Sequence, residues 1–349
     1  MHKALLITMG DAAGIGPEII AKAFRDAPAE MAGCVVVGDV STLRRACALM
    51  AAPLALAVAQ LDSPSQVWTL PPRCVGVLQK CELVAPVPFG LVSALAGKAA
   101  ADCIVWAARS VLAGEAAGMV TAPIHKEALA AAGGWVAGFP GHTELLQAEA
   151  AAFAGQPVSE LPVRMMLAND ELKTVLVSIH LSLRRAIEAV TFDNVLQTLR
   201  ITHRAVAASL GRPPRMAVAG LNPHAGEGGL FGNEELTIIA PAIAAARAEG
   251  LDANGPFAPD TVFMRARNSP AKPGEFDVVV AMYHDQGLIP VKYLGVEQGV
   301  NVTLGLPLVR TSPDHGTAFD IAGNGVADAL SLLAAIRMAR QLALAQSKF

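Results

Sequence analysis

Short apolar segments alternate with helix-forming segments along nearly the whole chain, which strongly limits the folds that the sequence can adopt. This alternation is typical of an α/β fold with mostly parallel sheets. The predicted helices are Thr42–Met50, Ala94–Ala113, Ile187–Leu210 and one that begins at Pro17. The predicted strands are Ala4–Thr8, Cys34–Val37, Gly76–Leu78, Gly118–Thr121, Arg164–Leu167, Val175–Ile179, Met216–Gly220 and Val278–Met282.

The length and composition favour a two-domain subunit of an oligomer. With 349 residues, the chain is longer than one hydrophobic core usually organises. Apolar residues make up 53% of the chain and charged residues only 16%. So few charges fit a protein that buries part of its exterior against another subunit.

Several classes of protein are excluded. The net charge of −3 and the lack of a Lys/Arg-rich run argue against nucleic-acid binding. The first apolar stretch is too short for a signal-peptide core, and no segment reaches membrane-spanning length. The five cysteines form no CxxC motif, which indicates reduced thiols. We therefore expect a cytoplasmic protein without membrane or nucleic-acid partners.

Three apolar runs each end in a histidine: Leu172–His180, Met216–His224 and Phe276–His284. Ligands in open α/β sheets bind outside the carboxyl ends of the strands. One histidine at such a place is more often structural, but three at matching places favour a divalent-metal site with open positions for substrate. Polar neighbours that could orient the rings are Ser178, Asn222 and Asp285. Among the other histidines, we interpret His2, His125 and His203 as structural.

The segment Gly10–Glu18 (GDAAGIGPE) links a predicted strand to a predicted helix. Glycines at such a turn let ligand oxygens approach backbone N–H groups at the helix N-terminus. The segment is not a GxGxxG fingerprint, so a purely structural turn is an equally good interpretation.

A set of residues suited to anions lies further along the chain: His142 and Thr143 within GHTE, Lys292, Asn301 and Arg310. A His-Thr pair that opens a helix offers donors to a phosphate. Cations among apolar neighbours need a partner, which a substrate anion could supply. The alternative is that Lys292 and Arg310 are surface cations with extended side chains.

The segment Asp314–Gly323 (DHGTAFDIAG) combines small residues with a histidine and two acids. Such a tight loop could hold a planar base and a ribose. An aspartate suits the ribose hydroxyls of NAD and would repel the additional phosphate of NADP.

Together these segments resemble the PdxA family, from Ile7 to about Gly325. The most specific stretches are VTAPIHK (Val120–Lys126), GHTE (Gly141–Glu144), GLNPHAGEGG (Gly220–Gly229), MYHDQG (Met282–Gly287), VNVTLGLPLVRTS (Val300–Ser312) and DHGTAFDIAG (Asp314–Gly323).

The resemblance implies two α/β/α domains like those of isocitrate and isopropylmalate dehydrogenases, with the active-site cleft between them. The first domain would contain residues 1–125 and 306–349, and the second residues 126–305. It also implies a homodimer whose active site is shared across the interface.

The resemblance further implies roles for individual residues. His180, His224 and His284 would bind one divalent metal ion (zinc, cobalt, manganese or magnesium), with His284 coming from the partner subunit. His142, Thr143, Lys292, Asn301 and Arg310 would contact substrate. His315, Gly316, Thr317 and Ala318 would lie near the adenine of NAD, and Asp320 near its ribose. Lys292 and Asp285 are the candidate catalytic residues.

The implied reaction is an NAD- and metal-dependent oxidation, with decarboxylation, of a 4-phosphorylated hydroxy acid. The leading substrate is 4-hydroxy-L-threonine 4-phosphate, which would give 3-amino-2-oxopropyl phosphate in pyridoxal phosphate biosynthesis. Alternatives are 4-phospho-D-threonate or 4-phospho-D-erythronate, a terephthalate-type cis-dihydrodiol carboxylate, and a binding protein without catalysis. Retention of GHTE and of the arginine segment favours a phosphorylated substrate over the dihydrodiol.

Overall fold

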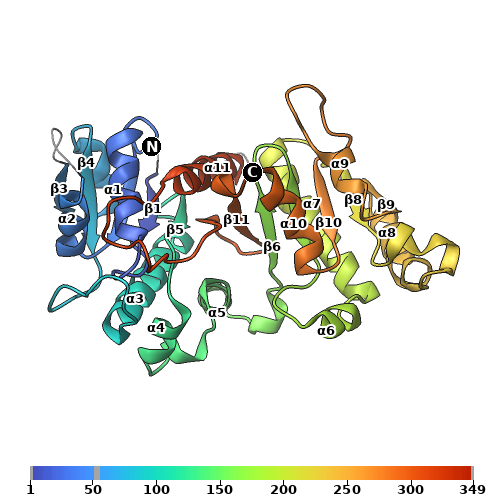
Figure 1. Cartoon of the computed structure of the whole chain (residues 1–349), viewed down its shortest axis with the longest axis horizontal. Helices are drawn as coiled ribbons and strands as arrows, with labels where there is room; N and C mark the ends of the chain where they lie inside the picture. The colour runs from blue at the N-terminus through green and yellow to red at the C-terminus, as the bar shows by residue number, and fades with distance from the viewer. Residues whose placement is uncertain (1–2, 51–55, 347–349) are drawn as a thin grey trace. The chain divides into compact units, whose positions relative to one another are not determined.

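The computed structural model describes residues 3–50 and 56–346, which divide by their contacts into two units (Figure 1). The first unit contains the chain up to Pro162 and the segment Leu306–Ala343. The second contains Val163–Gly305 and the chain from Leu344 onward. Residues 126–162 pack in the first unit, although the sequence analysis assigned them to the second domain. The domain boundaries therefore stay a prediction.

The first unit is built on a parallel sheet in the order β3-β4-β2-β1-β5-β12. Its inner strands are mostly apolar and almost completely buried, as expected for strands covered on both faces. The strand bounds are β1 Leu5–Thr8, β2 Cys34–Gly38, β3 Ala57–Leu61, β4 Cys74–Gln79, β5 Gly118–Thr121 and β12 Arg310–Pro313.

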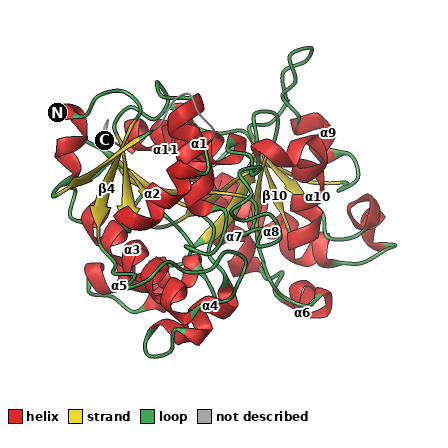
Figure 2. Cartoon of the chain, turned by 60° about the vertical axis from the view of Figure 1, so that its left-hand side comes forward, coloured by secondary structure: helices red, strands yellow, loops and turns green. Residues whose placement is uncertain are grey.

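Helices pack on the strands of this unit (Figure 2). Two of them begin at side-chain caps: Asp39 accepts a hydrogen bond from the Thr42 amide at 2.7 Å, and Ser93 accepts one from the Ala96 amide at 3.4 Å. The α-helices are α1 Gly16–Asp26, α2 Val40–Ala48, α3 Ala94–Leu112, α4 Lys126–Ala131, α5 His142–Ala154 and α11 Leu330–Gln346. Short 3₁₀ turns are η1 Pro64–Thr69, η2 Val136–Gly138 and η3 Val158–Glu160.

The second unit has a mixed sheet in the order β11-β6-β7-β10-β8-β9. Strand β6 runs antiparallel to both of its neighbours, and the strands from β7 to β9 are parallel. The bounds are β6 Arg164–Ala168, β7 Lys173–Leu176, β8 Met216–Ala219, β9 Ala253–Phe257, β10 Val278–Ala281 and β11 Val300–Leu304.

The core of the second unit contains apolar side chains of β7, β8 and β10 together with those of α9 and α10, such as Phe263 and Leu288. The α-helices are α6 Leu183–Glu188, α7 Phe192–Leu210, α8 Ala240–Ala248, α9 Val262–Ala266 and α10 His284–Gly295. The remaining turns are η4 Pro223–Gly229, the π-helical η5 Glu235–Ile239 and η6 Val296–Gln298.

The predicted α/β class with mostly parallel strands is confirmed. The predicted helix Ile187–Leu210 is interrupted, because α6 ends at Glu188 and Thr191 caps the new helix α7 through the Asn194 amide. In the described part of the chain, no helix has both the length and the apolar character needed to cross a membrane.

Candidate active site

The three strands that precede the predicted metal ligands are neighbours in the second unit. Strand β10 pairs in parallel with β7 on one side and with β8 on the other. His180 follows β7, His284 follows β10 and His224 follows β8. All three histidines therefore lie in segments that leave the same edge of the sheet.

Two of these imidazoles are in contact within one chain. The ring centroids of His180 and His284 are 5.6 Å apart. The Nδ1 atom of His284 lies 2.7 Å from the Asp285 carboxylate. Such a carboxylate fixes the ring orientation and leaves Nε2 as the nitrogen that can bind a metal. The donors therefore fit a divalent ion, and Asp285 is placed to orient a ligand.

His224 lies in a turn with an unusual backbone. Residues 224–228 all have positive φ, with φ 51° at His224 itself, and His180 also has φ 51°. Positive φ is uncommon for residues other than glycine and costs about 1–3 kcal/mol where it is held. Two of the three predicted ligands therefore have strained backbones, which is frequent at functional sites.

A buried carboxylate holds the turn of His224 in place. Glu235 is 2% exposed, and its Oε1 accepts hydrogen bonds from the Leu221 and Asn222 amides, each at 2.7 Å. Its Oε2 accepts a third from Asn222 Nδ2 at 2.9 Å. The strand end before His224 is thus fixed by a charged group that the sequence analysis did not identify.

Within the part of one chain that the structure describes, the three histidines do not form a complete metal site. No group of three or more His, Cys, Asp or Glu side chains there is placed to hold an ion. The His224 ring instead contacts Phe231, with 6.2 Å between the centroids. His180 and His284 are in contact with each other. That His224 joins them as the third metal ligand stays a prediction.

The first unit contains the residues suited to an anion. Arg310 is 3% exposed, and its Nε and Nη2 donate to the Thr121 hydroxyl at 3.1 and 2.7 Å. Burial lowers the pKa of Arg310 to about 10, while the charge of Glu144 acts in the opposite direction. Arg310 therefore still carries its charge at neutral pH.

His142 begins helix α5 and lies close to this cation. Burial, and next the charge of Arg310, hold the pKa of His142 well below its usual range, while its hydrogen bond to the Ala122 carbonyl acts in the opposite direction. The ring is therefore neutral at pH 7, and its Nε2 is buried without a partner in the described structure. Thr143 is half-buried in the first turn of the same helix. A cation and a helix N-terminus meet here, as anion sites require. Because the neutral ring donates its one N–H to the Ala122 carbonyl, its Nε2 is an acceptor.

The other predicted substrate contacts belong to the second unit. Lys292 lies on α10 with an exposed side chain. Asn301 is half-buried in β11, where it pairs with Leu167 of β6. The structure therefore brings His142, Thr143 and Arg310 together in one unit, and it places Lys292 and Asn301 in the other.

The predicted cofactor loop follows β12 in the first unit. Thr317 is buried, whereas His315, Gly316 and Asp320 are exposed and Ala318 has φ 42°. The Thr317 carbonyl accepts a hydrogen bond from the Ile15 amide at 3.0 Å. A loop with a fixed backbone and outward polar side chains fits a nucleotide ligand.

Three supporting residues were not predicted from the sequence. Gln286 donates to the Gly220 carbonyl and accepts from the Met282 amide, each at 2.7 Å, so it ties the ends of β8 and β10 together. Glu235 and Thr121 have similar supporting roles. Gln286 lies within the MYHDQG stretch and Thr121 within VTAPIHK, and these stretches are the available signals. Glu235 is eleven residues from His224 and shows none.

The chain matches the family model described as pyridoxal phosphate biosynthetic protein PdxA over residues 30–339. It belongs to the PdxA family. A relative from Beijerinckia indica, named 4-hydroxythreonine-4-phosphate dehydrogenase, is 52% identical, with 97% of this chain and 94% of the relative covered. Another from Pectobacterium atrosepticum, named D-threonate 4-phosphate dehydrogenase, is 42% identical over 98% of this chain and 100% of its own.

Among solved structures, the 4-hydroxythreonine-4-phosphate dehydrogenase of Klebsiella pneumoniae has a TM-score of 0.84 at 42% identity. The match covers 98% of this chain and 99% of that one. The predicted family and α/β fold are confirmed, and so is the prediction that this PdxA-family chain is a dehydrogenase.

Proposed function

We propose that this PdxA-family chain oxidises a small hydroxy acid that carries a terminal phosphate, with NAD as the hydride acceptor and one divalent metal ion per site. The leading substrate is 4-hydroxy-L-threonine 4-phosphate, and decarboxylation of the oxidised product gives 3-amino-2-oxopropyl phosphate. The observation that carries this proposal is the buried Arg310 beside a neutral His142 at the start of α5. The names of the relatives support the same substrate class.

The phosphate would bind in the first unit. Arg310 supplies a charged donor, Thr143 a hydroxyl, and the first turn of α5 its backbone N–H groups. The Nε2 of His142 is an unpartnered buried acceptor, which would take a hydrogen bond from a substrate hydroxyl or from a protonated phosphate oxygen. Glu144 serves as the countercharge of Arg310 when no anion is bound.

The metal would be bound by His180, His224 and His284. When bound, it lowers the pKa of the substrate hydroxyl and stabilises negative charge on that oxygen during oxidation and decarboxylation. Asp285 orients His284. We propose that Lys292, on the same helix, receives or returns the proton that the hydroxyl exchanges.

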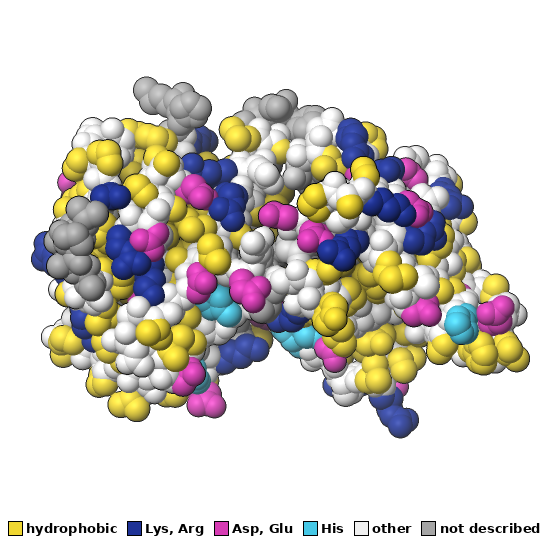
Figure 3. Space-filling model, turned by 45° about the horizontal axis from the view of Figure 1, so that its top comes forward, with side chains coloured by type: hydrophobic (Ala, Val, Ile, Leu, Met, Phe, Trp, Pro, Cys, Tyr) yellow, Lys and Arg dark blue, Asp and Glu magenta, His cyan; other side chains and the backbone are white. Residues whose placement is uncertain are grey.

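A second copy of the chain would complete the site. Large apolar side chains are exposed on the elements that follow the three histidines, and apolar surface beside one histidine side chain is visible at the right of Figure 3. Contiguous exposed apolar surface marks a contact with another protein. These side chains are Leu181, Leu183 and Ile187 near His180, Leu230, Phe231 and Leu236 near His224, and Ile289 and Tyr293 near His284.

The cofactor would bind at residues 315–320, with His315, Gly316, Thr317 and Ala318 toward the adenine and Asp320 toward the ribose. Asp320 is exposed, so its carboxylate is available to ribose hydroxyls. Its charge favours NAD over NADP. We further propose that the enzyme acts in the cytoplasm.

A second candidate substrate is D-threonate 4-phosphate, because relatives of that name are 42–44% identical over nearly the whole chain. NADH formation from the two phosphorylated acids, and from the cis-dihydrodiol of terephthalate, separates the candidates. We expect oxidation of a phosphorylated acid and none of the dihydrodiol. Turnover of the dihydrodiol alone would overturn the proposal.

A further inference from the structure

The predicted cofactor loop belongs to a longer irregular segment. Residues 314–329, between β12 and α11, form neither helix nor strand. The backbone N–H and C=O groups of such a segment need partners outside it. Its position therefore depends on the side chains that supply those partners.

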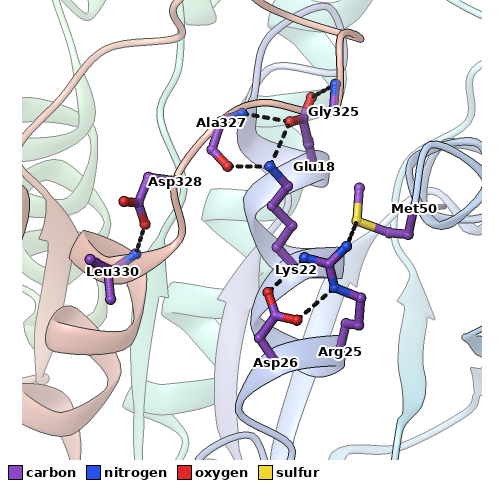
Figure 4. Close-up of polar contacts among 9 residues, drawn as sticks. All are labelled: Glu18, Lys22, Arg25, Asp26, Met50, Gly325, Ala327, Asp328 and Leu330. Atoms are coloured by element: carbon purple, nitrogen blue, oxygen red, sulfur yellow. Dashed lines mark hydrogen bonds and ion pairs between the residues drawn. The ribbon is translucent and has the colours of Figure 1, made fainter. Parts of the chain in front are cut away.

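We propose that Glu18 and Lys22 of α1 are positioning residues for the nicotinamide cofactor, because they anchor the downstream end of its loop. Glu18 Oε1 accepts a hydrogen bond from the Ala327 amide at 2.8 Å, and Oε2 accepts one from the Gly325 amide at 3.3 Å (Figure 4). Lys22 Nζ donates to the Ala327 carbonyl at 2.5 Å. Both polar groups of the Ala327 backbone are thus held by one helix.

The charged groups of Glu18 and Lys22 are buried, which indicates that they serve to hold this backbone segment. The Glu18 side chain is 2% exposed and that of Lys22 is 12% exposed, and their charged atoms are 3.5 Å apart. A buried charge is costly unless it is paired and hydrogen-bonded. An apolar pair would fill the same space without this cost, but it could not hold a backbone N–H and C=O. The need to hold the backbone of this segment therefore explains why a costly ion pair is buried here.

The upstream part of the segment is held by the turn that precedes the same helix. The Ile15 amide donates to the Thr317 carbonyl at 3.0 Å. At Gly14, an added Cβ would lie 2.9 Å from the Thr317 carbonyl oxygen, so the close approach needs glycine. The exposed His315 and Asp320 thus belong to a segment whose backbone is fixed on both sides of Asp320. Such preorganisation strengthens binding because less ordering is required when the ligand arrives.

This inference rests on the proposed function, since it assumes that the loop binds the cofactor. The test uses the full-length variants Glu18→Gln and Lys22→Met, which keep the side-chain size. The matched control is Asp26→Asn, since Asp26 lies on the same helix and, among the residues that the structure describes, its carboxylate forms hydrogen bonds only with Arg25 (Figure 4). NADH affinity is measured by fluorescence titration. Hydrogen exchange of the amides of residues 314–327 is measured without cofactor.

We expect both anchor variants to weaken NADH binding by about tenfold or more. Exchange at Gly325 and Ala327 should become faster, and KM for NAD should rise more than kcat falls. Asp26→Asn should match the wild type in each measurement. Faster exchange with unchanged NADH affinity would overturn the inference, and so would unchanged exchange.

NADH binding by the wild-type protein separates failure of the positioning role from failure of the proposed cofactor site. If wild-type protein binds NADH and the anchor variants bind it equally well, only the positioning role is wrong. If wild-type protein does not bind NADH, the proposed cofactor site is wrong, and the positioning role is overturned with it.

Discussion

The imidazole of His125 is stacked on the phenyl ring of Phe319, with 4.6 Å between the ring centroids and 14° between the planes. His125 follows β5, and Phe319 lies within the predicted cofactor loop. The buried Asp11 carboxylate is close by. Burial raises its pKa, while a hydrogen bond from the Ala13 amide and then the charge of His125 act in the opposite direction. A histidine that the sequence analysis interpreted as structural therefore contacts the loop directly.

The stack should contribute measurably to stability. We expect His125→Ala and Phe319→Ala each to lower the free energy of unfolding, with a coupling between them of about 0.5–1.5 kcal/mol. Urea unfolding of the two single variants and the double variant gives this coupling. Strict additivity of the two single effects would show that the ring contact adds no stability.

Arg310 should dominate the binding of phosphate. Arg310→Met removes a buried charged donor, and hydrogen bonds to charged groups contribute about 1.5–3 kcal/mol, which corresponds to a loss of about ten- to a hundredfold in affinity. Inorganic phosphate, titrated by calorimetry, provides the measurement. Arg109→Met is the control, since Arg109 lies in an exposed ion pair with Glu149 of the same unit. Equal phosphate affinity in the two variants would remove Arg310 from the site.

The low pKa of His142 should appear in the pH dependence of stability. Its ordinary value is 6.5 and its folded value is well below that, so between the two values the unfolded chain binds the additional proton. The stabilisation is fully present above pH 6.5 and is lost as the pH falls toward the folded pKa, at up to about 1.4 kcal/mol per pH unit. His142→Gln should lack this loss.

Urea unfolding at about pH 7.5 and about pH 5.5 provides the check, since other titrating groups cancel in the difference between wild type and variant. A variant that loses as much stability as the wild type between these values would mean that His142 is protonated normally.

The carboxylate of Glu235 should support metal binding without touching the ion. Glu235→Gln replaces one acceptor oxygen by a donor, which must face either the backbone amides of Leu221 and Asn222 or the Nδ2 group of Asn222, so the turn of His224 should shift. We expect a loss of about 10–100-fold in affinity for added zinc, as for other outer supports of metal ligands. Unchanged zinc affinity in a folded variant would show that the turn holds its shape without this carboxylate.

Sharing of the metal site between two copies can be tested by mixing variants. If His284 comes from the partner, each mixed dimer of a His180→Ala chain and a His284→Ala chain has one intact site and one defective site. Since about half of the dimers in an equal mixture are mixed, about a quarter of all sites are intact. A mixture of His180→Ala and His224→Ala chains recovers none. Because His180 and His284 are already in contact within one chain, His224 is the competing candidate for the ligand from the partner. Recovery in the second mixture alone would assign the partner's residue to His224.

The elements that could be predicted from the sequence are those whose local residue pattern matches their burial in the folded protein. Strands such as β1, β2 and β10 are uninterrupted apolar runs between turns, and each lies inside a sheet. Strand β9 was missed because Gly255 and Pro256 are poor strand formers, and it lies at the edge of its sheet, where they are tolerated.

For a similar reason, some residues of the candidate site could be predicted from the sequence and others could not. His180, His224 and His284 could be selected as candidate ligands because strand ends carry a pattern along the chain, and their joint role in metal binding stays a prediction. Glu235 and Glu18 could not be assigned a role, since each acts on backbone groups that are distant in sequence or exist only in a folded turn. The distance from Glu18 to Ala327 along the chain is 309 residues, and no local signal spans it.

The central proposal is that a bound metal ion assists the oxidation of a phosphorylated hydroxy acid. The most direct test measures NADH formation from 4-hydroxy-L-threonine 4-phosphate by protein from which the metal has been removed. We predict no NADH without added metal and recovery when zinc, cobalt or manganese is supplied, with no recovery in a variant that carries His180→Ala and His284→Ala together. Full turnover by the stripped protein, or by that double variant, would contradict the account.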